Sequence, residues 1–161
     1  MLKKSPLAPE QFPEIGHVAG VSLTALRSEE RYSGRDDVLL ALFAEGTTSA
    51  AVFTKSLAPG APVSWSREVH AAGEAQAMVV TAGNANVCTG RQGMENTRAV
   101  AAAVAELGGV RAEQVFVSST GVIGEQLKVE RILNSLPAQL EANYQQQAWQ
   151  DAAAAIMTTD T

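Results

Sequence analysis

Short apolar runs recur along this chain, and their length constrains its fold more than any other feature. Residues 38–43 read VLLALF, residues 75–80 read AQAMVV and residues 113–117 read EQVFV. Runs this short are typical of buried strands, because helices usually need about 10 residues or more. An Ala-rich segment, residues 94–107, carries Val100 and Val104 four apart and is followed by two glycines, which predicts a helix and its end. Strands mixed with helices predict an α/β or α+β class.

The remaining segments complete the predicted order of elements. Residues 18–26 alternate partly between apolar and polar side chains, and residues 49–54 read SAAVFT, a strand pattern. Residues 63–68 follow the break PGAP and fit either a strand or the start of a helix. Residues 81–93 are rich in Gly and Asn, which predicts a loop. Residues 128–136 and 138–157 predict helices that Pro137 separates.

Length, composition and charge exclude several classes of function. The 161 residues suit one domain or two very small ones, and we divide them into an N-terminal arm, residues 1–15, and a domain, residues 16–161. The net charge of -5 gives no reason to expect nucleic acid or an anionic membrane as a partner. No signal-peptide pattern and no transmembrane-length apolar run is visible, so we expect a cytoplasmic protein. The single cysteine excludes an internal disulfide and a zinc site built from cysteines.

The segment VSSTGVIGEQL, residues 117–127, places small hydroxyl residues and a glycine directly after an apolar run. This composition predicts a strand-to-helix turn whose backbone N–H groups are uncovered. Such a turn can bind an anion or the negative oxygen that develops during acyl transfer. It can equally be a turn with a helix cap and no further role.

A second polar segment, TAGNANVCTGRQG at residues 81–93, has two interpretations. Asn84 and Asn86 follow an apolar run, and their side chains both donate and accept hydrogen bonds. They could bind a ligand, or they could brace an irregular loop. Cys88 has no histidine in a recognisable partner motif, so we expect a packed or loop thiol. The glycines do not match the spacing of nucleotide-binding motifs.

The last residues, MTTDT at 157–161, also combine side chains that could carry chemistry. Three threonine hydroxyls and the carboxylate of Asp160 could orient a polar small molecule. The same residues could form only a cap or a turn. The residues alone leave both interpretations open.

Taken together, these segments resemble the bifunctional ornithine acetyltransferase and glutamate N-acetyltransferase family of arginine biosynthesis, in its N-terminal, α-chain portion. The resemblance covers about residues 18–161, and the combination of GNANxCTGxxG with SSTGVIG is specific. Four matching segments occur in the family's order: AAVFTKSLAPGAPVSWSRE, VVTAGNANVCTGRQG, VFVSSTGVIGEQL and AIMTTDT.

The resemblance implies an N-terminal-nucleophile enzyme whose precursor cleaves itself before a threonine. The resulting α and β chains stay together as an α2β2 heterotetramer. The new N-terminal threonine of the β chain takes the acetyl group from N-acetylornithine and passes it to glutamate, and bifunctional members also use acetyl-CoA. The implied fold is a layered sandwich with β-sheets between helices. No metal or organic cofactor is implied.

The resemblance also implies roles for individual residues. Thr120 and Gly121 correspond to the oxyanion hole, and Thr158, Thr159 and Thr161 correspond to substrate-binding positions. The sequence ends at Thr161, before the KGSG-like segment that precedes the cleavage point, so we expect the nucleophile on a separate β chain. The N-terminal arm, residues 1–15, matches no family pattern.

Two alternatives remain beside this interpretation. One is a related self-cleaving acyltransferase or hydrolase that acts on another acyl-amino acid. The other is a non-catalytic fragment that keeps the polar pocket. A KGSG-like segment followed by a threonine in the remainder of the protein would favour the enzyme.

Overall fold

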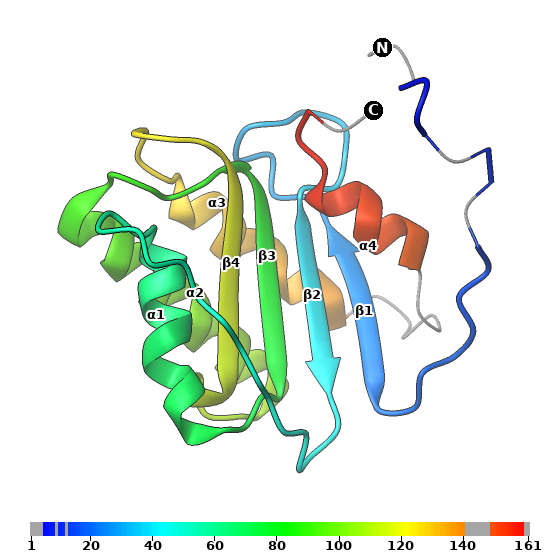
Figure 1. Cartoon of the computed structure of the whole chain (residues 1–161), viewed down its shortest axis with the longest axis horizontal. Coiled ribbons are helices and arrows are strands. Elements are labelled where there is room, and N and C mark those ends of the chain that lie inside the picture. Colours follow the sequence, from blue (N-terminus) through cyan, green and yellow to red (C-terminus); the bar gives the residue numbers. More distant parts are fainter. Residues whose placement is uncertain (1–4, 9, 12, 141–148, 160–161) are drawn as a thin grey trace.

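A computed structural model describes residues 5–8, 10–11, 13–140 and 149–159. Its described residues contain one four-stranded sheet in the order β1-β2-β3-β4 (Figure 1). The pairs β1–β2 and β2–β3 are antiparallel, whereas β3–β4 is parallel. The four strands are β1 (Val21–Leu26), β2 (Val38–Phe43), β3 (Ala77–Asn84) and β4 (Val115–Val122).

Helices lie on both faces of this sheet, which confirms the mixed α/β prediction. Helix α1 packs along β4, α2 and α3 cover the same side, and α4 lies across β1 and β2 on the opposite side (Figure 1). Because the described residues form a single sheet, the predicted sandwich of several sheets stays a prediction, as does the boundary at residue 16. The helices are α1 (Ala61–Val69), α2 (Gly90–Gly108), α3 (Val129–Ser135) and α4 (Trp149–Ile156), with 3-10 turns η1 (His70–Ala72), η2 (Ala112–Gln114) and η3 (Leu136–Leu140).

The hydrophobic core lies between the sheet and α2. Val79 and Val117 point from neighbouring strands toward this helix, which presents Val100 and Val104 to them, and all four side chains are buried. The predicted helix is therefore confirmed, although it begins at Gly90, within the predicted loop. It ends as predicted, because Gly109 adopts a left-handed conformation and donates its N–H to the carbonyls of the last turn.

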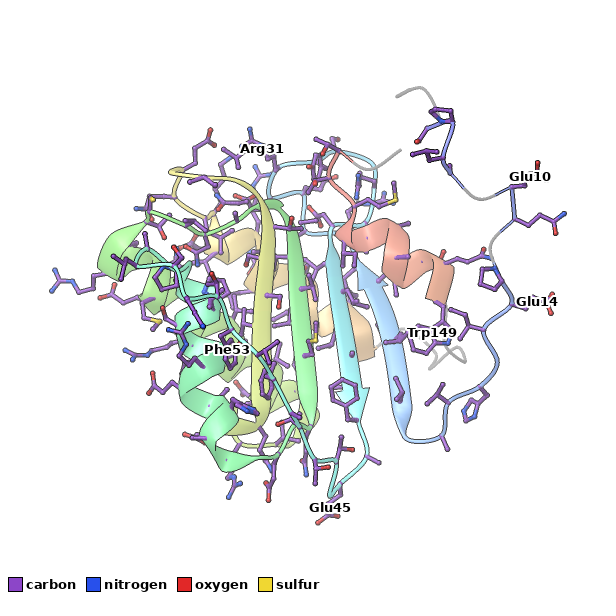
Figure 2. The ribbon with its side chains drawn as sticks, viewed as in Figure 1. Glu10, Glu14, Arg31, Glu45, Phe53 and Trp149 are labelled. Carbon is purple, nitrogen blue, oxygen red and sulfur yellow. The ribbon has the colours of Figure 1, made fainter. Side chains whose placement is uncertain are left out.

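Residues 49–54, predicted as a strand, are not one. Strand β3 occupies the place beside β2. At the edge of β4, side chains of the helix that follows this segment take the hydrogen bonds of Val115 and Val117, so the segment forms no ladder there. Near it the structure has an isolated bridge between Thr48 and Glu74, and Val52 is fully exposed. Figure 2 shows Phe53 on this linking segment between β2 and α1.

Two other predictions were settled in favour of helix. Residues 63–68 belong to α1, which has a proline in its first turn, where proline fits because its missing N–H has no helical partner. The predicted helix at residues 138–157 contains the end of η3 and α4, and residues 141–148 lie outside the described part. Among the described residues, no helix is both long enough and apolar enough to span a membrane.

Strands β3 and β4 run further than the sequence predicted. The segment SSTG was predicted as a strand-to-helix turn, and this is wrong: β4 continues through Val122, and the next helix begins at Val129. The extension depends on two glycines that pair across the strands, Gly83 and Gly121, whose φ angles are 115° and 133°. Without side chains at this pair, the two backbones approach closely and the ladder continues.

Candidate active site

One side of β4 is a free sheet edge, and α1 covers only its first part. The carbonyl of Val115 accepts a hydrogen bond from Trp65 Nε1 at 2.9 Å. Ser66 Oγ donates to the carbonyl of Val117 at 2.8 Å and accepts from its N–H at 3.2 Å. Since the backbone groups of a strand alternate in direction, the N–H groups of Ser119 and Gly121 point to the same edge, beyond α1.

The side chain of Thr120 lies on the face of the sheet that α2 does not cover. Val115 and Val117 point into the core, so the alternating residues Phe116, Ser118 and Thr120 point to the opposite face. There Thr120 lines a hollow of about 530 Å³. The other lining residues come from β3, β4 and the end of α4: Val80, Ser118, Ser119, Ala153, Ile156, Met157 and Thr158.

This hollow brings together two of the groups that the sequence singled out. Thr120 and Thr158 are far apart in the chain, yet both line it, and both are partly buried. Thr159 is exposed and is not among the lining residues. Thr161, with Asp160, lies outside the described residues. The structure therefore joins the STG motif to the first threonine of MTTDT and leaves the next one in solvent.

The lining of the hollow is neutral. Its hydroxyl groups come from Ser118, Thr120 and Thr158, and Val80, Ala153, Ile156 and Met157 are apolar. Ser119 also lines it, but by the alternation of the strand its side chain points to the opposite face, where its Oγ hydrogen-bonds Thr81 Oγ1 at 2.8 Å. No group of His, Cys, Asp or Glu side chains within the described ranges could hold a metal ion. Such a lining suits an uncharged acyl group and hydrogen-bond donors directed at its carbonyl oxygen.

Gly121 is required at its position by close backbone contact. A Cβ placed there would lie 2.6 Å from the backbone nitrogen of Asn84 and would overlap the carbonyl of Gly83. Its φ of 133° also lies in a region that essentially only glycine adopts. An exposed N–H at Gly121 and a hydroxyl at Thr120 thus follow each other in the chain, which is a donor pair suited to an oxyanion.

The Asn segment braces the end of β3, as the second interpretation of the sequence predicted. Asn86 is 1% exposed, its Nδ2 donates to Gly93 O at 2.9 Å and Thr97 Oγ1 at 3.0 Å, and its Oδ1 accepts from Thr89 Oγ1 at 2.6 Å. Both amide donors and the amide oxygen are therefore engaged. Asn84 Oδ1 accepts the N–H of Asn86 at 2.8 Å. Cys88 is an exposed free thiol.

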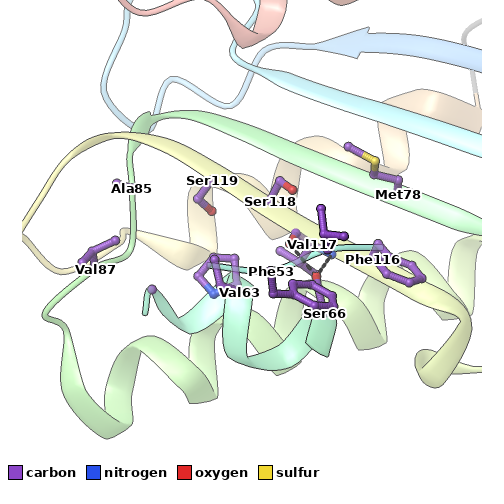
Figure 3. A pocket seen from close by; sticks show the side chains of 13 residues that line it. Phe53, Val63, Ser66, Met78, Ala85, Val87, Phe116, Val117, Ser118 and Ser119 are labelled. Atoms are coloured by element: carbon purple, nitrogen blue, oxygen red, sulfur yellow. Dashed lines mark hydrogen bonds between the residues drawn. The ribbon is translucent and has the colours of Figure 1, made fainter. Parts of the chain in front are cut away.

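Sequence reasoning missed a second pocket, of about 300 Å³, at the free edge of β4 (Figure 3). Phe53, Val63 and Phe116 form apolar walls, and Ser118 and Ser119 line both this pocket and the hollow. The only signal in the sequence was the double serine of SSTG. Its partners come from α1 and the linking segment, whose positions no local pattern indicates.

Comparison with known proteins identifies the family. The profile of the ArgJ family matches residues 22–161, nearly the whole chain. The chain belongs to the ArgJ family. A curated relative, the arginine biosynthesis bifunctional protein ArgJ of Gluconobacter oxydans, is 47% identical over 163 residues. The alignment covers 100% of this chain but 38% of that relative, so the chain spans well under half the length of the ArgJ proteins it matches.

Two solved structures of the family are also similar. The arginine biosynthesis bifunctional protein ArgJ of Bacillus halodurans is 31% identical, with a TM-score of 0.80 over 91% of this chain and 78% of that one. The ornithine acetyltransferase of Mycobacterium tuberculosis, solved with ornithine, is 32% identical, with a TM-score of 0.81 over 89% of this chain and 78% of that one. The predicted family resemblance is thereby confirmed, and the fold is that of ArgJ structures.

Proposed function

We propose that this chain is the α-chain portion of an ArgJ acetyltransferase that transfers the acetyl group of N-acetylornithine to glutamate. Acetyl-CoA would serve as a second acetyl donor if the protein is bifunctional like its curated relatives, whose names include that word. The solved relative that binds ornithine supports an ornithine-type substrate. One observation carries the proposal: Thr120 and Thr158 line the same neutral hollow, beside the open edge where the N–H of Gly121 points.

The chemistry proceeds in two acyl transfers. A threonine of the partner chain attacks the acetyl carbonyl of N-acetylornithine, and the C–O bond that forms pushes negative charge onto the carbonyl oxygen. The Thr120 hydroxyl and the Gly121 N–H donate to that oxygen. When the tetrahedral species collapses, the C–N bond breaks, and ornithine leaves with the proton that the threonine hydroxyl released. An acetyl-threonine ester remains.

Glutamate then reverses these steps. Its amine attacks the ester carbonyl, the same two donors stabilise the second oxyanion, and the threonine hydroxyl leaves with a proton from the attacking amine. The products are N-acetylglutamate and free enzyme. Thr158, together with Thr159 and Thr161, contacts the substrate in this proposal.

The need for a partner chain has support in the lengths of the relatives. This chain covers 78% of the matched chain in each solved structure but 38% of the curated relative. The matched chains in the solved structures are therefore less than half as long as the curated protein. This agrees with a protein that functions as two polypeptides. In this proposal the β chain carries the nucleophile, two αβ pairs form an α2β2 assembly, and further layers cover the open face of β3 and β4.

The neutral lining of the hollow does not select between acyl-amino acids, so groups outside it must determine which one binds. No charged side chain among the described lining residues is available to pair with the charged ends of ornithine, so those ends must be held from outside them. A related enzyme with another acyl-amino acid, or a fragment without catalysis, would share the same hollow. The acyl donor must therefore be tested directly.

Intact-mass spectrometry under denaturing conditions tests this proposal. The chain is purified together with the remainder of its protein and incubated with N-acetylornithine without glutamate. We expect a second polypeptide that begins with threonine, gains the mass of one acetyl group and loses it when glutamate is added. A single polypeptide, or a second one that never gains an acetyl group, would contradict the proposal. If only a different acyl-amino acid acylates the threonine, that compound takes the place of N-acetylornithine as the proposed donor.

A further inference from the structure

Arg35 joins the segment between β1 and β2 to the end of α4. Its Nη2 donates to the carbonyl of Ala154 at 2.8 Å and to that of Met157 at 2.7 Å. These carbonyls belong to the last turn of the helix and the residue that follows it, where a positive charge is favourable because the helix dipole is negative there. Figure 1 shows this end of α4 beside the segment between β1 and β2.

The guanidinium of Arg35 is itself held in place. It lies 4.6 Å from the centre of the Tyr32 ring, and its Nε donates to the carbonyl of Asp36 at 3.2 Å. The neighbouring Asp37 is 1% exposed, and its carboxylate accepts from the N–H of Ser28 at 2.7 Å and from the Ser28 hydroxyl at 3.0 Å. Arg35 therefore projects from a segment that is tied to the sheet.

Apolar packing restrains the end of α4 only in part. The side chains that this helix buries are those of Ala152 and Ala155, which bring close contact but little area. Ile156 and Met157 are each 37% exposed. The two hydrogen bonds from Arg35 therefore add a directed restraint to the last residues of α4, beside this packing.

We propose that Arg35 is a positioning residue, which holds the carbonyl of Met157 so that the next residue, Thr158, stays on the lining of the hollow with Thr120. The inference rests on the proposed function, in which Thr158 contacts the substrate. Arg35 acts through α4 and does not line the hollow. Arg35 lies in none of the segments that the sequence singled out.

Two variants and one control separate this role from a general loss of stability. Arg35→Met keeps the length of the side chain but removes the donors and the charge, and Arg35→Lys keeps the charge with a single donor nitrogen. Arg91→Met is the matched control, because the Arg91 side chain is 93% exposed and its ion pair within the described residues is the i,i+4 pair with Glu95. KM for N-acetylornithine and kcat are measured on the assembled protein, and hydrogen–deuterium exchange is measured at residues 149–159.

We expect Arg35→Met to raise KM by roughly tenfold with kcat changed by less than about threefold. The variant weakens a contact to the substrate and leaves the oxyanion donors in place. Exchange should become faster at residues 149–159 and stay unchanged in β4. Arg35→Lys should recover part of the affinity, and Arg91→Met should match the unchanged protein.

Unchanged exchange at α4 in Arg35→Met would overturn the inference, and so would faster exchange with unchanged KM in an active enzyme. A loss of kcat at unchanged KM, with lower thermal stability, would reduce Arg35 to a structural role and would also overturn it. An unmodified protein that transfers no acetyl group would instead overturn the proposed function, and the positioning role with it.

Discussion

Gly121 has two constraints: a close contact with the backbone of β3, and a proposed role for its N–H as an oxyanion donor. Its α-carbon faces the carbonyl of Gly83 so closely that no side chain fits, while its N–H points to the free edge of β4. The same closeness that excludes a side chain keeps Thr120 and Gly121 at a fixed distance from β3. A donor pair on a strand braced in this way is preorganised, which is the property that oxyanion stabilisation requires.

Replacement of Gly121 by alanine should therefore be costly. We expect Gly121→Ala to destabilise the protein by about 3 kcal/mol or more, because the new Cβ overlaps backbone atoms and the φ angle is unfavourable for alanine. Gly124→Ala is the control, since it also has a positive φ but meets nothing within 4 Å, and it should cost about 1 kcal/mol. Urea unfolding measures both, and equal effects would refute the close-contact argument.

Asn86 should be equally sensitive, although it takes no part in the chemistry. Asn86→Ala removes three buried hydrogen bonds and leaves the Thr89 hydroxyl without its partner, while Gly93 O and Thr97 Oγ1 keep the bond to each other, so we expect a loss of about 3 kcal/mol. Asn134→Ala, at an exposed position of α3, should stay within about 0.5 kcal/mol of the unchanged protein. Thermal unfolding of the two variants compares them. A change of less than 1 kcal/mol for Asn86→Ala would mean that the network does not brace the loop.

The residues of the site were predictable only in part. Thr120, Gly121 and Thr158 were named from the family motifs, and the structure brings Thr120 and Thr158 to one hollow. The residues alone could not show which hydroxyl faces the hollow, because Thr158 and the exposed Thr159 are adjacent and chemically identical. The role of Asn86 stayed open because its partners are set by tertiary structure: Thr97, for example, lies on α2 and meets Asn86 only once the loop has folded.

At the scale of elements, α1 takes the place of a fifth strand beside the first half of β4. Trp65 and Ser66 supply the donors and the acceptor that a neighbouring strand would provide to Val115 and Val117. The helix ends its coverage there, so the second half of the edge, from Ser119 onward, stays accessible. This division of β4 into a covered and an open half places the candidate site at residues 119–121.

Removal of the Ser66 hydroxyl tests whether α1 takes the place of a strand at this edge. Ser66→Ala leaves the N–H and the carbonyl of Val117 without a side-chain partner, so we expect a loss of about 2 kcal/mol. Faster hydrogen exchange should appear at the Val117 amide. Ser64→Ala, on the same helix but with no side-chain hydrogen bond to β4, is the control. If both variants unfold at the same denaturant concentration, α1 does not stabilise the edge through Ser66.

Helices and strands were predicted well where the local sequence pattern determines them, and poorly where contacts with distant segments determine them. The Ala-rich segment formed α2 and ended at its glycines as predicted. Residues 49–54 carry a strand pattern, but β3 lies beside β2 and α1 takes the first half of the β4 edge, so they form no ladder. Strand β4 runs past its apolar residues because Gly83 and Gly121 allow pairing to continue, and this depends on a contact between distant segments.

At the scale of the whole molecule, the sheet has one complete face and one incomplete face. Helices α2 and α3 cover the first, whereas α4 covers the second over β1, β2 and part of β3 but not over β4 (Figure 1). The hollow lies where this cover ends. Composition and periodicity predicted the mixed α/β class but not this asymmetry, because the layers of a fold depend on which elements meet. We propose that the partner chain covers the open part of that face.

The central claim is that Thr120 and Gly121 stabilise the oxyanion of an acetyl transfer in the assembled protein. The most direct measurement is kcat for transfer from N-acetylornithine to glutamate in the unchanged protein, Thr120→Ser and Thr120→Val. We expect a loss of about 100-fold in kcat for the valine variant and near-normal turnover for the serine variant, because serine keeps the hydroxyl donor and valine removes it. Equal turnover in all three proteins would contradict a role for the Thr120 hydroxyl.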